Sequence, residues 1–123
     1  MRWDLVPRGP LPAGCSTVGV TALDVNTSGA AYASGPSLTC GPGLRYWVRA
    51  VVKVAAYDSD GQWSYLTPVN PSAPTLDRTP SHRSELTACS SGQLLEPVAS
   101  FVLLWPDGHQ VRYKLVGPSA RCR

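Results

Sequence analysis

Hydrophobic and polar residues alternate along residues 44–68 in a way that predicts a long β-hairpin. In its first arm, one set of alternate positions is apolar, and the other set mixes aromatic, basic and apolar side chains. Because successive strand side chains point to opposite faces, we expect the first set to be buried and the second to be partly solvated. The first set is Tyr46, Val48, Ala50, Val52, Val54 and Ala56; the second is Trp47, Arg49, Val51, Lys53, Ala55 and Tyr57.

Residues 58–61, Asp-Ser-Asp-Gly, predict the turn of this hairpin. Gly61 can adopt positive φ, and the aspartates can accept hydrogen bonds from nearby backbone amides. The same four residues resemble the start of a calcium loop, but no acidic residue follows within reach to complete the ligands, so the turn is the preferred interpretation. Pro68 ends the return arm because it cannot donate to a strand ladder.

A second hairpin is predicted over residues 98–115, with Pro106-Asp107-Gly108 as its turn. Its outgoing arm is apolar on both faces, which indicates a central, covered strand, whereas its return arm has one polar face. Shorter strands are expected at residues 15–25, 30–34, 37–40 and 84–90. Residues 68–83 are rich in proline and lack periodicity, which indicates a long connection between sheets or a functional loop.

Composition supports a fold made of strands. Eleven glycines and twelve prolines interrupt a chain of 123 residues, and no amphipathic window of helical period extends beyond about two turns. The length predicts one domain. We therefore expect an all-β, antiparallel two-sheet β-sandwich of about seven or eight strands over residues 15–123, preceded by an extended N-terminal arm over residues 1–14.

The four cysteines predict two disulfide bonds. They are widely spaced and form no Cys-x-x-Cys pair, and neither histidine lies at metal-ligand spacing, so no zinc site is expected. Of the three possible connectivities we favour the one in which each pair brackets a separate block of strands and leaves the central hairpin uncrossed. Each bridge would close a loop of roughly 25 to 35 residues and stabilise the fold by about 3 to 4 kcal/mol. The favoured pairs are Cys15 with Cys40 and Cys89 with Cys122.

Disulfides in a small β-rich domain indicate an oxidising compartment, so we expect a secreted protein. Residues 1–12 lack the apolar run of a signal peptide, and we interpret the chain as a mature form with a replaced start. The net charge of +3 is too small and too dispersed to indicate nucleic-acid binding. No stretch approaches the roughly 20 apolar residues of a membrane helix.

Candidate chemistry is sparse. His82 lies in the proline-rich segment and His109 adjoins a turn, and no serine stands in a Gly-x-Ser-x-Gly motif. Glu85 and Glu96 have no acidic neighbour in sequence. We therefore expect no enzyme, no catalytic residue, no cofactor and no bound metal. Asn26-Thr27-Ser28 matches the glycosylation sequon, although a turn explains it equally.

The aromatic residues give a more specific hypothesis. Trp47 and Tyr57 share the more polar face of the first arm, and Trp63 and Tyr65 share one face of the return arm. Flanked by Arg49 and Lys53, they can form either a second core face or a partly exposed platform. Because Trp, Tyr and Arg dominate interface hot spots, a platform would be a contact surface for protein or sugar.

Part of the central hairpin resembles fibronectin type III and immunoglobulin-like strands: Tyr-Trp-Val-Arg-Ala-Val, a charged turn, then Gln-Trp-Ser. The resemblance covers about a fifth of the chain, lacks the full Cys…Trp…Cys spacing, and implies architecture only. The closing Ser-Ala-Arg-Cys-Arg and the two-disulfide plan also resemble small secreted amylase inhibitors. The Trp-Arg-Tyr motif of that family is absent, since residues 45–47 read Arg-Tyr-Trp.

These observations predict a non-enzymatic, extracellular adaptor or subunit that binds another protein. The candidate contact residues are Trp3 and Arg8 in the N-terminal arm and the aromatic and basic residues of the hairpin: Trp47, Arg49, Lys53, Tyr57, Trp63 and Tyr65. Residues 5–9 also resemble a thrombin cleavage site, as in an expression vector. Two alternatives stay open: a secreted inhibitor of a protease or glycosidase, using Arg8 or the proline-rich segment as bait, and a carbohydrate-binding module.

Overall fold

The computed structural model describes residues 10–41, 45–66 and 75–123, and the regular structure within these ranges consists of β-strands only. Every paired strand is antiparallel to its neighbour, so the all-β antiparallel prediction is confirmed. The strands are β1 (Cys15–Val18), β2 (Ala22–Val25), β3 (Ala30–Gly35), β4 (Ser37–Cys40), β5 (Trp47–Tyr57), β6 (Trp63–Tyr65), β7 (Thr75–Leu76), β8 (Arg78–Thr79), β9 (His82–Arg83), β10 (Thr87–Ala88), β11 (Leu94–Leu104), β12 (Gln110–Val116) and β13 (Ala120–Arg121).

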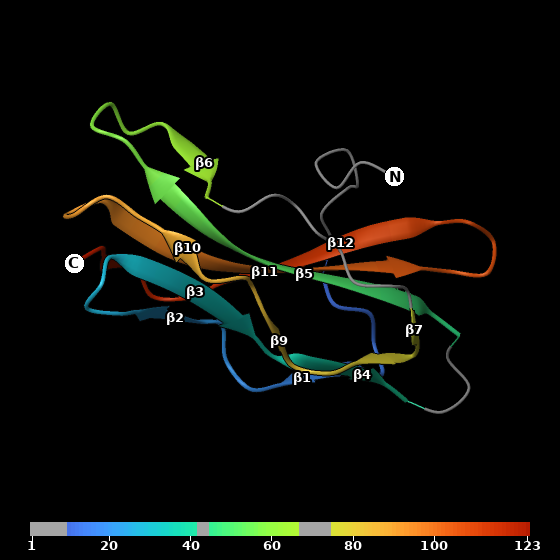
Figure 1. Ribbon diagram of the computed structural model, residues 1–123. Helices are drawn as coiled ribbons and strands as arrows, with labels where there is room; N and C mark the ends of the chain where they lie inside the picture. The colour runs from blue at the N-terminus through green and yellow to red at the C-terminus, as the bar shows by residue number, and fades with distance from the viewer. Residues whose placement is uncertain (1–9, 42–44, 67–74) are drawn as a thin grey trace.

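The two predicted hairpins form one long sheet. Its strand order is β12-β11-β5-β6, while β13 also pairs with β11 and β7 also pairs with β5. The strands β5 and β11 lie side by side over eleven residues each, and β11 is the central, covered strand that its two apolar faces predicted. Figure 1 shows this sheet extending across the molecule, with β6 and β7 near its opposite ends.

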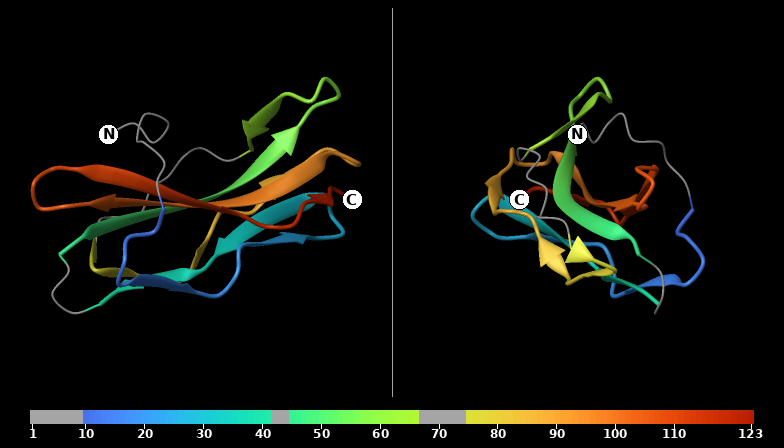
Figure 2. Two further views of the ribbon diagram at one scale, coloured as in Figure 1. Left: turned by 180° about the vertical axis from the view of Figure 1, so that it is seen from behind. Right: turned by 90° about the vertical axis from the view of Figure 1, so that its right-hand side faces the viewer.

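Two smaller sheets pack against one face of the long sheet. One has the order β1-β4-β8, and the other contains β10-β3-β2 with β9 paired to β3. Both lie on the same side of β5 and β11 in Figures 1 and 2. The described strands therefore form three hydrogen-bonded sheets in two layers.

The face of the long sheet that meets the smaller sheets is the main core, and we call it the core face. Two clusters of buried side chains fill it, one beneath β4 and one beneath β3, and the partly buried Val52 packs against both. Phe101, Leu38 and Leu103 are the largest fully buried side chains in the first cluster, and each side chain of this kind contributes about 1.5 to 3 kcal/mol. The core-face side chains are Val48, Ala50, Val52, Val54 and Ala56 on β5, with Leu95, Pro97, Ala99, Phe101 and Leu103 on β11.

The opposite face, which we call the outer face, combines the two interpretations that the sequence left open. Its ends are partly exposed, whereas its centre is a second buried face, in which Val51 and Ala55 are buried and Lys53 is only 4% exposed. Val98, Ser100 and Val102 on β11 point to the same face and are buried as well. The centre of the outer face is therefore inaccessible, and only its two ends carry exposed aromatic side chains.

A glycine permits the close approach of β3 to the core face. A Cβ atom on Gly35 would lie 2.9 Å from Cβ of Ala99 and 3.0 Å from Cγ2 of Val52. Such contacts are shorter than packed carbon atoms tolerate, so a side chain at this position would push the two layers apart.

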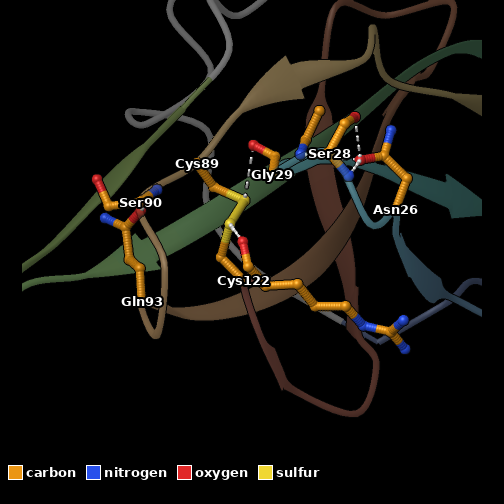
Figure 3. The surroundings of a disulfide bond; sticks show 9 residues. Asn26, Ser28, Gly29, Cys89, Ser90, Gln93 and Cys122 are labelled. Carbon is orange, nitrogen blue, oxygen red and sulfur yellow. Dashed lines mark hydrogen bonds between the residues drawn. A yellow bond between two sulfur atoms is a disulfide. The ribbon is translucent and has the colours of Figure 1, made fainter.

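Both predicted disulfides are present. Cys15 and Cys40 are directly opposite on β1 and β4, with Cα atoms 3.9 Å apart, and they close the small sheet. Cys89 and Cys122 have Cα atoms 6.0 Å apart and join the end of β10 to the end of the chain. Figure 3 shows the second bridge beside the β2–β3 turn, with the Cys89 sulfur close to the carbonyl oxygen of Gly29. The Cys89 amide donates to the same carbonyl oxygen at 2.9 Å.

The turns follow local side-chain chemistry. Asp58 Oδ1 accepts hydrogen bonds from the amides of Asp60 and Gln62, both at 2.9 Å, and Gly61 has φ +79°. Residues 58–61 thus form the predicted turn. At the sequon, Asn26 Oδ1 accepts hydrogen bonds from the amide and the hydroxyl of Ser28, so this segment also forms a turn (Figure 3).

Two segments depart from the predicted strand layout. Residues 15–25 form two strands instead of one, because the chain turns at Gly19, which has φ +107°. The described part of the connection, residues 75–83, contains the short strands β7, β8 and β9, each bound to a different sheet. Period-two alternation cannot reveal strands of two residues, and their pairing depends on the neighbours available in space.

The end of the N-terminal arm contacts the body. Leu11 is partly buried against the first core cluster, and the carbonyl oxygen of Pro12 accepts a hydrogen bond from the Cys15 amide. Residues 1–9, including Trp3 and Arg8, lie outside the described residues.

Candidate functional site

Two rows of side chains cross the outer face, one at each end of the long sheet. Directly opposite residues on neighbouring strands point to the same face, so the strand register defines each row. The register places four residues in what we call the Trp47 row, namely Gln110, Leu104, Trp47 and Leu76. It places four others in what we call the Trp63 row, namely Arg121, Leu94, Tyr57 and Trp63.

The Trp47 row exposes large apolar side chains. Trp47 is 46% exposed and Leu76, directly opposite it on β7, is 43% exposed. Arg49 follows on the same face, and its Nε is buried without a hydrogen-bond partner. A cleft of about 570 Å³ adjoins Leu76 and is lined by Ser37, Thr39, Thr75, Leu76, Arg78, Thr79 and Pro80.

The Trp63 row begins with a still more exposed indole. Trp63 is 53% exposed, and its ring meets the Tyr65 ring edge to face at 5.0 Å between centroids. The Lys53 ammonium lies 3.9 Å from the centroid of that Tyr65 ring. Tyr65 is thus contacted by a cation and by an indole, which restricts its own ring and supports that of Trp63.

Tyr57, a member of this row, forms a polar pair with Glu96 on the same face. The Tyr57 hydroxyl donates to Oε1 of Glu96 at 3.3 Å. Burial raises the pKa of the Tyr57 phenol above its usual range, and the Glu96 carboxylate raises that pKa further through its charge and its hydrogen bond. The phenol therefore stays protonated at neutral pH and remains a hydrogen-bond donor.

A second cleft, also of about 570 Å³, lies between two turns at this end of the sheet. One wall is the β5–β6 turn and the other is the β10–β11 turn, and three members of the Trp63 row reach into its lining. The lining residues are Tyr57, Asp58, Ser59, Gly61, Ser90, Ser91, Gly92, Gln93, Leu94 and Arg121.

Local contacts fix the β10–β11 wall of this cleft. Gln93 Oε1 accepts from the Ser90 amide at 3.1 Å, and Arg121 Nη1 donates to the Gly92 carbonyl oxygen at 2.9 Å. The Gly92 amide donates to the Cys122 carbonyl oxygen, and Cys122 is bonded to Cys89 at the start of the same turn. The second disulfide therefore braces the cleft as well as the fold.

The six predicted contact residues of the hairpin share the outer face, but they do not form one platform. Trp47 and Tyr57 are ten residues apart on β5, which separates the two rows by about 33 Å. Lys53, between them, is buried and contacts Tyr65. The structure thus brings together Tyr57, Trp63, Tyr65 and Lys53, and places Trp47 and Arg49 toward the other end.

Sequence reasoning missed the partners that complete each row. Leu76 lies in a two-residue strand, and Leu94 and Arg121 come from segments far from the hairpin in sequence. Glu96 stands two residues before Val98, the predicted start of the second hairpin, so extending that strand by two residues would have placed it. No signal in the sequence pairs Arg121 with Leu94.

Neither histidine reaches these clefts. The His109 ring packs edge to face on Trp105 at 4.7 Å. His82 Nδ1 lies 3.0 Å from the Pro80 carbonyl oxygen, and burial lowers the pKa of its imidazole. Within residues 10–41, 45–66 and 75–123, no three His, Cys, Asp or Glu side chains gather as metal ligands would. The same ranges contain no helix that could cross a membrane.

Comparison of this chain with protein-family models, with curated protein sequences and with solved structures finds no match. The two rows and their clefts are therefore the features of this chain from which a function can be inferred.

Proposed function

We propose that this protein is a non-enzymatic, extracellular interaction module that binds a protein partner through the Trp47 row. The observation that carries the proposal is the exposed pair Trp47 and Leu76, which occupy adjacent strands at one end of a rigid sheet. Exposed apolar side chains clustered in this way are typical of protein contact sites.

The surroundings of this pair suit a protein ligand. Tryptophan and arginine are among the residues most enriched in interface hot spots. Arg49 follows Trp47 on the same face of β5, and Arg78 lines the cleft next to Leu76. The cleft next to Leu76 offers a depression in which a side chain of the partner can be desolvated. Threonine and serine hydroxyls around that cleft form a polar rim, as expected of a non-obligate interface.

The compartment and the architecture support the same proposal. Two disulfides are compatible with a secreted protein, since such bonds persist in oxidising compartments. The two packed layers support an immunoglobulin-like sandwich as the class of fold. In this proposal the N-terminal arm, with Trp3 and Arg8, adds a second contact to the partner.

The test is a binding measurement with matched variants. The full chain is immobilised, partners are captured from the extracellular fraction of the source cells, and each captured protein is purified and titrated against the variants. Trp47→Ala and Leu76→Ser should each weaken binding by at least about tenfold, because each removes an exposed apolar anchor. Trp63→Ala serves as the control and should bind as the wild type does. A partner that binds Trp47→Ala and Leu76→Ser with unchanged affinity contradicts the proposal.

The inhibitor alternative has less support. It depends on Arg8, which lies outside the described residues, and on the proline-rich connection, of which only residues 75–83 are described. No contact within the described residues favours it.

A further inference from the structure

We infer that the cleft beside the Trp63 row is a binding site for a neutral oligosaccharide. This site is about 33 Å from the proposed protein contact and does not depend on it. Three independent features lead to this ligand class: an exposed aromatic ring in the row beside the cleft, and, in the cleft itself, a balanced set of charges and several hydroxyl and amide groups.

The aromatic feature is the Trp63 indole. One face of a pyranose ring presents C–H groups, which carry partial positive charge and pack on the negative face of an aromatic ring. Trp63 is 53% exposed, and Tyr65 supports it edge to face. Tyr57, the next side chain in the row, extends the aromatic surface into the cleft.

The charges of the cleft favour a neutral ligand. Its lining contains one guanidinium, from Arg121, and one carboxylate, from Asp58. Asp58 Oδ1 already accepts two backbone hydrogen bonds, and Arg121 Nη1 already donates to Gly92. The remaining groups of both side chains can bind hydroxyls, while an anionic or cationic ligand would meet a like charge on one wall.

The hydrogen-bonding groups match a polyol. The hydroxyls of Ser59, Ser90 and Ser91 can donate and accept hydrogen bonds. The side-chain oxygen of Gln93 accepts from the Ser90 amide, so its NH₂ group is the part that can donate to a ligand. A peptide would instead need a pocket for apolar side chains, and the cleft offers only Leu94 and Tyr57 as apolar floor.

The row also indicates the size of the ligand. It crosses four strands from Arg121 to Trp63, a distance of about 14 Å at the usual spacing of strands. That distance exceeds one pyranose ring, so the site fits a chain of sugars, with one ring stacked on Trp63 and the following rings in the cleft.

The experiment titrates the full, oxidised chain with five neutral hexasaccharides: cello-, xylo-, manno-, malto- and chitohexaose. Binding is followed by calorimetry and by tryptophan fluorescence. At least one of them should bind, and Trp63→Ala should weaken that binding by about tenfold or more. Trp63→Phe, which keeps an aromatic face, should restore part of the affinity. Trp47→Ala is the matched control and should bind as the wild type does.

Three outcomes overturn the inference: no hexasaccharide binds at millimolar concentration, Trp63→Ala binds with unchanged affinity, or a uronate or sulfated hexasaccharide binds more tightly than every neutral one. Circular dichroism of each variant confirms that it is folded. If the protein partner of the Trp47 row is itself lost on Trp63→Ala, the Trp63 row belongs to the protein interface and the sugar site is rejected. If the Trp47 row proves not to bind a protein partner, the sugar titrations still test this site, because they do not use that partner.

Discussion

The core face and the outer face of the long sheet are built by the same two central strands, yet they differ in chemistry and in exposure. On the core face β5 and β11 present only apolar side chains, which pack closely against two smaller sheets. On the outer face the same strands bury a mixed centre that contains Lys53 and Ser100, and they expose a tryptophan-bearing row at each end. The two exposed rows are therefore anchored on strands whose other side is fixed by the core.

The difference shows how a small β-protein can build a core on one face of a sheet and still carry exposed side chains on the other. Alternation sends one set of side chains to the core and leaves the other free to vary in chemistry. Contact residues on a strand are positioned more precisely than residues on a loop, because the core face fixes the backbone that carries them. Substitutions on the two faces should consequently have separable effects, and the following predictions test that separation.

Phe101→Ala should give the largest loss of stability. Phe101 is 1% exposed at the centre of the first core cluster, and its truncation leaves a cavity that costs about 3 to 5 kcal/mol. Urea denaturation of the oxidised protein measures this loss. Trp63→Ala, the control on the outer face, should lose less than about 1 kcal/mol. Similar losses of unfolding free energy in Phe101→Ala and Trp63→Ala would show that the two faces do not differ in their contribution to stability.

Gly35→Ala should cost about 1 to 3 kcal/mol, because the added methyl group collides with Ala99 and Val52 across the two layers. The same denaturation measurement applies. Removing the opposing methyl group should relieve the collision. The double variant Gly35→Ala, Ala99→Gly should therefore lose less free energy of unfolding than the sum of the losses in the two single variants. Strict additivity would mean that the layers are not in the close contact observed.

Lys53→Met should test the buried centre of the outer face. The substitution keeps most of the apolar stem and removes the ammonium that lies over Tyr65, a contact worth about 1 to 2 kcal/mol when desolvated. A double-mutant cycle with Tyr65→Leu should give a coupling free energy of about 1 kcal/mol. Arg49→Met, the same change four residues earlier on this face, should show no coupling with Tyr65. Equal coupling for both residues would refute a specific contact.

The smallest effect is expected from His82, which lies on β9 opposite Gly35. Burial lowers the pKa of its imidazole below the usual 6.5, so the unfolded chain binds the proton more readily than the folded one. Stability from this group is therefore complete at neutral pH and declines as the pH falls below about 6.5, toward the lowered pKa. Lowering the pH from 7.5 to 5.5 should reduce the thermal midpoint of the wild type more than that of His82→Gln. An equal reduction in the two proteins would contradict this prediction.

Prediction from sequence succeeded where a pattern is long and local. Eleven-residue alternation identified β5, two apolar faces identified β11 as central, and the Asp58 to Gly61 turn followed from residue types alone. It failed where the environment of a residue depends on segments that are far apart in sequence. The buried state of Lys53 was missed because a lysine in an alternating pattern reads as solvated, whereas its stem packs in the sheet and its ammonium meets Tyr65.

The candidate sites divide in the same way. The aromatic residues Trp47, Tyr57, Trp63 and Tyr65 were evident in the sequence, and their common face followed from the period of two. Their separation into two rows was not evident, nor were the residues that complete each row. Leu76 and Arg121 reach those rows through pairings between segments far apart along the chain.

The amino-acid sequence by itself determined the all-strand composition and the positions of the two hairpins, and it favoured the observed pairing of Cys15 with Cys40 and of Cys89 with Cys122. These properties depend on the side-chain period, the turn residues and the order of the cysteines. All three can be read along the chain without knowing its three-dimensional arrangement. Only the tertiary structure decided which face of the long sheet is covered, which ends stay exposed and which clefts adjoin them. Coverage of a face depends on where remote strands such as β3 and β4 pack, and that choice is made by the free energy of the whole fold and not by any local segment.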